Sequence, residues 1–366
     1  MKRILSLDGG GIRGMFSLQI LARIEQVFRE KRGRPGLVLR DEFDLIAGTS
    51  TGGIIATFLA WGLPVAEIDD LYTRFGAAMF TQAGWLDRLW KNKYNPETIA
   101  QFFKERFSED DGTPALLGTR KLWAGGVPKY LVLVMRNATT GSAWPVSNNP
   151  AAEYNRESRP NCNLRLPLWQ LLRASTAAPT FFPPEEITFP GCDPQIFIDG
   201  GITPYNNPAL IAFLMATLPG YKLEWPAGRD RIQLVSVGTG QVRQRLPDKE
   251  AREFHLLDHA KYATPALMAS TNLEQDLLCR VLGECLAGGE IDRELKSLMP
   301  SGLLAPAEKK FTYLRYDQAF TVAEIEKIEQ DTQLKFGLDN LGLIEPLRAL
   351  GRAYAAKHVE PAHLVP

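Results

Sequence analysis

A serine flanked by glycines is the first feature of the sequence that could do chemistry. Residues 48–52 fit the pattern G-x-S-x-G, with Ser50 at the centre. In this pattern the serine lies on a tight turn between a strand and a helix, where side chains at the flanking positions would not fit. The first N–H groups of the following helix point at the place where negative charge develops during acyl transfer. The motif therefore predicts that Ser50 is a nucleophile, with Gly48 and Gly52 shaping its turn.

A second glycine-rich turn, at residues 8–14, is open to two interpretations. The backbone N–H groups of consecutive glycines can converge on one oxygen and form an oxyanion hole, worth roughly 3 kcal/mol per donor. The same stretch also satisfies G-x-G-x-x-G, which is typical of dinucleotide-binding oxidoreductases. That fingerprint needs an acidic residue after the next strand, where this chain has the Ser50 turn instead, so acyl transfer is favoured. The candidate oxyanion residues are Gly9, Gly10, Gly11 and Arg13, and we expect Asp8 and Gly14 to organise the loop.

The base that would activate the serine hydroxyl could be a histidine or a carboxylate. Asp199 ends an apolar stretch and precedes Gly200 and Gly201, so its carboxylate should project from the carboxyl edge of a sheet and could take the proton directly. The histidines all lie in the C-terminal part of the chain, away from such a strand end (His255, His259, His358 and His363). We therefore expect Asp199 to be the base. A metal site is not expected, because the pair at 255 and 259 lacks a third ligand.

These turns require a particular order of strands and helices. Apolar stretches predict strands at 3–7, 43–47, 130–135, 195–199 and 231–237, and 311–316 is also strand-like. Helical periodicity predicts helices at 20–28, 54–61 and 168–174. Strand, glycine turn and helix occur twice in succession near the N-terminus, which indicates an α/β fold with a mostly parallel sheet. Residues 141–163, rich in Asn, Pro and Ser, are expected to form a loop.

Composition argues against several classes of protein. Lysine plus arginine balance aspartate plus glutamate at 42 each, so overall charge does not favour a nucleic-acid polymer as partner. No apolar run is long enough to span a membrane, and the first residues lack a signal-peptide core. The 4 cysteines follow no disulfide or metal-binding spacing, which fits a reduced, cytoplasmic setting.

Taken together, these blocks resemble the patatin-like phospholipases. Residues 8–14, 48–53 and 199–201 are similar, in order, to the three signature blocks of that family, and residues 174–184 look like its proline-containing block. The resemblance implies a three-layer α/β patatin-like fold and a Ser50–Asp199 dyad that needs no histidine, metal or cofactor. It also implies that ester-linked acyl chains are hydrolysed from phospholipids or galactolipids at a membrane surface, through an acyl-enzyme.

The resemblance extends over residues 1–245, which we expect to form the catalytic domain. Residues 246–366 are expected to be a mainly helical C-terminal region, packed on that domain or continuous with it. The overall length resembles bacterial patatin-like enzymes, some of which are antiphage effectors activated by a cyclic nucleotide. This adds, as hypotheses, a cyclic nucleotide activator, a homo-oligomer, and a cytoplasmic protein that is peripheral at the inner membrane when active.

Other functions remain open at this stage. A nucleotide-dependent oxidoreductase would use the glycine loop at 9–14, a carboxylesterase would act on non-lipid esters, and a scaffold protein would need neither Ser50 nor Asp199. The aromatic stretch from 75 to 90, which includes Trp85 and Trp90, could be a lid that opens onto a membrane or a helix packed on the core.

Overall fold

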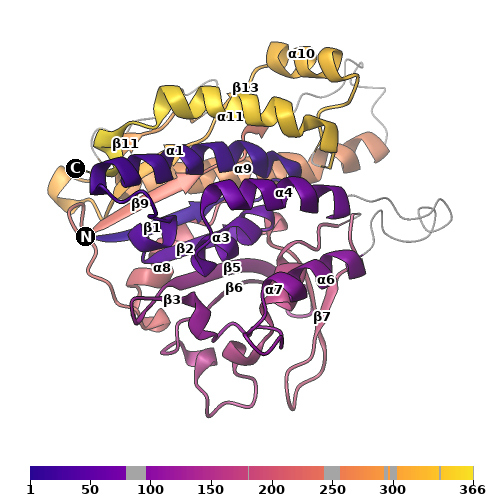
Figure 1. The fold of residues 1–366 in the computed structure, drawn as a ribbon, viewed down its shortest axis with the longest axis vertical. Coiled ribbons are helices and arrows are strands. Elements are labelled where there is room, and N and C mark those ends of the chain that lie inside the picture. The colour runs from indigo at the N-terminus through magenta and orange to yellow at the C-terminus, as the bar shows by residue number, and fades with distance from the viewer. Residues whose placement is uncertain are drawn as a thin grey trace.

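A mixed β-sheet forms the centre of the computed structural model, which describes residues 1–79, 96–179, 181–242, 256–291, 296, 303–337 and 339–365. The strands of this sheet are β1 (Lys2–Leu7), β2 (Leu45–Thr49), β5 (Tyr130–Asn137), β6 (Ser142–Ser147), β7 (Glu185–Ile187), β8 (Gln195–Asp199), β9 (Ile232–Val237), β11 (Glu284–Ala287) and β12 (Thr312–Tyr316). Among the described residues they lie in the order β11-β12-β9-β1-β2-β5-β8-β7, and β6 also pairs with β5 (Figure 1).

The strands from β11 to β5 run parallel to their neighbours in that order, whereas β6, β7 and β8 pair antiparallel. The expected α/β fold with a mostly parallel sheet is therefore confirmed. Because parallel strands share the direction of their ends, the loops that follow β1, β2, β9 and β12 emerge at one edge of the sheet.

Helices cover both faces of the sheet and complete the three layers. One face carries α1 (Gly14–Arg32), α3 (Thr51–Trp61), α4 (Val65–Met79), α6 (Pro96–Arg106), α7 (Leu168–Ser175) and α11 (Ile344–His358), and the other carries α8 (Ala209–Thr217) and α9 (Leu256–Leu282). Figure 1 shows α11 lying along α1. Successive strand residues alternate between the two cores: Leu5 and Ile46 face α1 and α3, whereas Ile4 and Leu45 face α8.

The expectation of a loop over residues 141–163 is wrong in part. Ser142–Ser147 forms β6, which pairs antiparallel with β5. Trp144 of this strand packs on Phe197 of β8, with ring centroids 4.9 Å apart. Pro145 is tolerated because β6 is an edge strand, where a missing N–H need not break a ladder.

The sheet continues into the C-terminal part of the chain. β12 pairs in parallel with β9 along its whole length, and β11 pairs with β12. Shorter elements complete the described chain: α2 (Leu39–Glu42), α10 (Val322–Thr332), α12 (Pro361–Leu364), the pair β3 (Trp123–Ala124) and β4 (Val127–Pro128), and the pair β10 (Gln241–Val242) and β13 (Ala319–Phe320). Residues beyond 245 thus supply strands to the same sheet that carries the N-terminal turns.

Candidate active site

Ser50 occupies a sharp turn between β2 and α3. Its backbone has φ 53° and ψ −123°, a conformation that few residues other than glycine adopt. A Cβ at Gly48 would lie 2.2 Å from the carbonyl oxygen of Gly52, and a Cβ at Gly52 would lie 2.3 Å from the carbonyl oxygen of Leu7. The close packing expected at both glycines is present, and it leaves the Ser50 side chain at the carboxyl edge of the sheet.

Asp199 meets Ser50 at this edge. The Ser50 hydroxyl donates a hydrogen bond of 2.7 Å to Asp199 Oδ2, and the Gly201 N–H donates one of 2.6 Å to Asp199 Oδ1. Asp199 is buried, and burial raises the pKa of its carboxyl to about 6, although both hydrogen bonds act to lower it. The carboxylate is therefore mostly ionised at neutral pH and able to accept a proton.

The glycine loop lies beside the serine, but its three amides differ. The Gly9 N–H donates to the carbonyl oxygen of Asn206 at 3.1 Å, so it is already occupied. Within the described part of the chain, no protein acceptor is assigned to the N–H groups of Gly10 and Gly11. A Cβ at Gly9 would lie 3.3 Å from Ser50 Cβ, which shows how closely the loop approaches the nucleophile. The geometry therefore leaves two of the three expected oxyanion donors free, and Gly9 departs from the expectation.

Arg13 holds the glycine loop from within. Its Nη1 donates to the carbonyl oxygen of Gly240 at 2.6 Å, and its Nε donates to the carbonyl oxygen of Gly10 at 3.4 Å. Burial lowers the pKa of this guanidinium, while Asp317 and Asp8 act to raise it. These contacts fix the position of the glycine loop, and both use Arg13 as a donor to backbone carbonyl oxygens.

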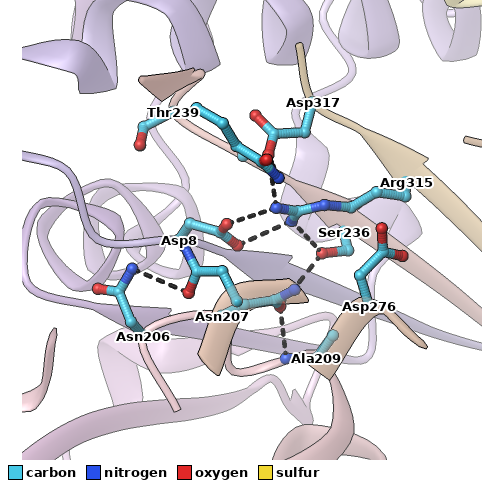
Figure 2. A network of polar contacts seen from close by, with 12 residues as sticks. Asp8, Asn206, Asn207, Ala209, Ser236, Thr239, Asp276, Arg315 and Asp317 are labelled. Atoms are coloured by element: carbon cyan, nitrogen blue, oxygen red, sulfur yellow. Dashed lines mark hydrogen bonds and ion pairs between the residues drawn. The ribbon is translucent and has the colours of Figure 1, made fainter. Parts of the chain in front are cut away.

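Asp8 is held by Arg315, a residue on β12 that the sequence reasoning missed. Arg315 donates to both Asp8 oxygens at 2.9 and 2.7 Å, and also to Ser236 Oγ and Asp317 Oδ2 at 2.8 Å each. Figure 2 shows these partners gathered around the guanidinium. The ion pair is buried, so it fixes the start of the glycine loop to the C-terminal part of the sheet. A single arginine in a strand gives no local signal of such a distant partner.

Two further hydroxyl side chains support the site. Ser175 accepts a hydrogen bond of 3.0 Å from the Ser50 N–H and donates one of 2.6 Å to the carbonyl oxygen of Val134. The Tyr72 hydroxyl, buried on α4, donates to the carbonyl oxygen of Gly11 and shares a hydrogen bond with Thr51 Oγ1. Ser175 belongs to the block at 174–184 that carried part of the resemblance, whereas nothing in the sequence indicated Tyr72.

The remaining candidates lie elsewhere or outside the described residues. His358 stacks on Tyr354, and His363 lies 3.9 Å from Glu360. His255, the His259 side chain, Trp85 and Trp90 are outside what the structure describes, so the lid stays a prediction. Among the described residues, no cluster of three or more His, Cys, Asp or Glu side chains is arranged to hold a metal ion. Nor does the described chain contain a helix long and apolar enough to cross a membrane.

The comparisons with known proteins agree on one family. Residues 5–213 match the model of the patatin-like phospholipase family. A Caenorhabditis elegans protein named intracellular phospholipase A2 is 34% identical over 247 residues, covering 65% of this chain and 19% of that protein. A cGAMP-activated phospholipase from Vibrio cholerae is 30% identical over 252 residues (65% of this chain, 64% of that protein). Another from Escherichia coli is 29% identical over 241 residues (65% and 62%).

The chain thus spans less than two thirds of the length of each of these relatives. The family match nevertheless includes the glycine loop, the Ser50 turn and Asp199, and it covers more than half of the chain. The chain belongs to the patatin-like phospholipase family.

Proposed function

We propose that the protein is a serine lipid acyl hydrolase with Ser50 as nucleophile and Asp199 as base. The observation that carries this proposal is the 2.7 Å hydrogen bond from Ser50 Oγ to Asp199 Oδ2, at the end of two strands that are far apart in sequence. Family membership favours acyl transfer over the dinucleotide interpretation of residues 9–14.

The proposed reaction has two halves. Ser50 Oγ attacks the ester carbonyl carbon while Asp199 accepts the hydroxyl proton, and the N–H groups of Gly10 and Gly11 donate to the oxyanion. The intermediate then expels the lipid alcohol, which receives the proton from Asp199, and an acyl-enzyme remains. A water molecule that loses its proton to Asp199 then attacks the acyl carbonyl carbon. The bond from this carbon to Ser50 Oγ breaks, Oγ takes the proton back from Asp199, and the fatty acid is released.

Membrane glycerolipids are the proposed substrates. Family membership and the phospholipase names of the relatives favour phospholipids, with galactolipids as the other ester class. A carboxylesterase acting on short, soluble esters is the alternative, because the same dyad would serve both. The enzyme would work as a peripheral protein at the inner membrane.

Two relatives named cGAMP-activated phospholipase motivate a second part of the proposal, a cyclic nucleotide that activates hydrolysis. An antiphage effector role and a homo-oligomer belong to the same hypothesis. We also propose that residues 1–245 form the catalytic domain, and that residues 246–366 continue it rather than fold separately. The last strands of the sheet, β11 and β12, support this continuity.

The test is hydrolysis of mixed-lipid vesicles, with the products identified by mass spectrometry, together with labelling by a fluorophosphonate. Wild type should release fatty acid and be labelled at Ser50, whereas Ser50→Ala should do neither and Asp199→Asn should lose hydrolysis. Ser142→Ala and Asp193→Asn, at exposed positions away from the site, are the matched controls. Equal fatty-acid release by Ser50→Ala and wild type would refute the dyad, and activity on soluble esters alone would favour the carboxylesterase.

A further inference from the structure

A cavity of about 790 Å³ opens at the same edge of the sheet as the Ser50 site, but beyond the ends of β11 and β12. Its walls come from the loops after these strands and from α9 and α11. The volume is within the range of small-molecule sites, roughly 300–1,000 Å³. Most of the lining is polar or charged, so an acyl chain placed here would bury carboxylates against hydrocarbon at a cost of several kcal/mol. The cavity is therefore unsuited to the lipid tail.

The charges that face this cavity fall into two groups. Asp276 pairs with Arg280 at 2.8 Å, and Asp317 pairs at 2.8 Å with Arg315, which it shares with Asp8. Four further charged residues line the cavity: Lys357, Glu290 and Glu360 are exposed, and Glu324 is half-buried. A ligand that enters would thus meet one lysine ammonium and three carboxylates.

The cavity also offers a flat aromatic surface and an unused hydroxyl. The rings of Tyr354 and His358 stack with centroids 4.5 Å apart and planes at 28°, and both residues line the cavity. Burial and the nearby Lys357 lower the pKa of His358, so this ring is neutral at neutral pH. The Tyr316 hydroxyl is buried in the wall and has no hydrogen-bond partner among the described residues. A bound molecule could supply that partner.

One wall of the cavity belongs to the network that holds the glycine loop. Arg315 and Asp317 line the cavity; Arg315 fixes Asp8, and Asp317 Oδ1 accepts a hydrogen bond of 2.9 Å from the Gly240 N–H. The Gly240 carbonyl oxygen in turn accepts from Arg13. Both ends of the glycine loop are therefore one or two contacts away from the cavity (Figure 2 shows the Asp8 end).

We propose that this cavity binds a nucleotide, and that its occupancy sets the position of the glycine loop at the Ser50 site. A purine base fits the Tyr354–His358 pair, because bases stack on aromatic rings with roughly 1–3 kcal/mol each. Base amino groups donate to carboxylates such as Glu360, and a phosphate pairs with a lysine such as Lys357. The inference rests on the proposed nucleotide-activated hydrolase and gives the activator a site. A mononucleotide and a cyclic dinucleotide share this chemistry.

Calorimetric titration of the full chain with cGAMP, and separately with GMP, tests the assignment without relying on catalysis. We expect wild type to bind cGAMP, and Lys357→Ala and Glu360→Gln each to weaken binding at least tenfold. Lys327→Ala, an exposed lysine on α10 that does not line the cavity, should bind as wild type does. Equal affinity for GMP would identify a mononucleotide as sufficient. Absence of binding for both nucleotides, or unaltered binding by Lys357→Ala, would overturn the assignment.

The coupling is tested by the rate of Ser50 labelling with a fluorophosphonate. Saturating nucleotide should accelerate labelling of wild type and of Lys327→Ala severalfold, whereas Lys357→Ala should lose the response at the same nucleotide concentration. Gln241, which also lines the cavity, donates a 3.0 Å hydrogen bond from its Nε2 to Asp317 Oδ2, so Gln241→Met should respond less even at saturating nucleotide. A full response to nucleotide in both Gln241→Met and Asp317→Asn would contradict coupling of the cavity to the glycine loop through Asp317. If nucleotide binds but the fluorophosphonate labels neither wild type nor the variants, the hydrolase proposal is refuted and the cavity assignment still stands.

Discussion

At the scale of single residues, Ser50 combines an unusual backbone with a buried base. The positive φ of Ser50 costs on the order of 1–3 kcal/mol, and the hydrogen bonds of its N–H to Ser175 and of its carbonyl oxygen to the Ile54 N–H hold the turn in place. The turn directs the hydroxyl to Asp199. Reactivity then depends on the protonation of one carboxyl, whose pKa is raised by burial.

Activity should therefore fall in acid. Asp199 must be ionised to accept the proton, and its pKa is about 6, so kcat/KM should be constant above pH 7 and fall about tenfold per pH unit well below pH 6. The profile is best measured with a soluble ester, while fluorescence confirms that the protein stays folded, because Asp8 also titrates near pH 6. A flat profile down to pH 4.5 would show that Asp199 is not the base.

Protonation of Asp199, which should abolish activity, should instead stabilise the fold. The folded-state pKa is raised from 3.8 to about 6, so the ionised carboxylate destabilises the fold above pH 6, and this penalty is absent below pH 3.8. Asp199→Asn keeps the hydrogen bond from Gly201 and removes the charge. We expect it to raise the free energy of unfolding by roughly 1–3 kcal/mol at pH 8, and by much less at pH 4.5. Urea unfolding at both pH values measures this, and a less stable variant at pH 8 would contradict it.

At the scale of elements, the two glycine turns were predictable because their signals are local. The close approach of β1, β2 and α3 leaves no room for side chains at Gly48 and Gly52. This requirement is visible in the sequence as glycines spaced within a few residues. Strand β6 was not predictable in this way: its polar, proline-containing sequence is compatible with a loop, and Trp144 becomes a strand residue by packing on β8. Tyr72 was missed because its partners, Gly11 and Thr51, belong to two other elements.

Tyr72 joins those elements, so its hydroxyl should matter for catalysis. Tyr72→Phe keeps the ring in the core but frees the Gly11 carbonyl and leaves Thr51 Oγ1 without this partner. We expect kcat to fall roughly tenfold with little change in KM, because about 1.4 kcal/mol of transition-state stabilisation is lost when the oxyanion loop shifts. Tyr154→Phe, at an exposed tyrosine, is the control. Lower stability with an unaltered kcat would limit Tyr72 to a structural role.

At the scale of the whole molecule, the sheet ties the last third of the chain to the first loop. The sequence indicated the N-terminal strands one by one, but it could not indicate that β12 lies beside β9 or that Arg315 reaches Asp8, since strand order and ion pairing depend on contacts between distant segments. For the same reason, the boundary at residue 245 was placed where the resemblance to the family ends, although the sheet continues beyond it. The buried pair between Asp8 and Arg315 makes the two parts interdependent.

Replacing Arg315 should therefore unfold the protein more easily, and in a pH-dependent way. Arg315→Met leaves Asp8 and Asp317 buried without their cation, which typically costs about 3–5 kcal/mol. Losing the cation removes the contact that lowers the Asp8 pKa, so this pKa should rise above its present value of about 6. The folded variant then binds protons more tightly than the unfolded chain, and its stability should recover as the pH falls from 7.5 to 5. Lys310→Met, at an exposed lysine next to β12, should match wild type in urea unfolding at both pH values. A deficit of the same size at pH 7.5 and pH 5 would mean that lost packing, rather than an uncompensated buried charge, explains the change.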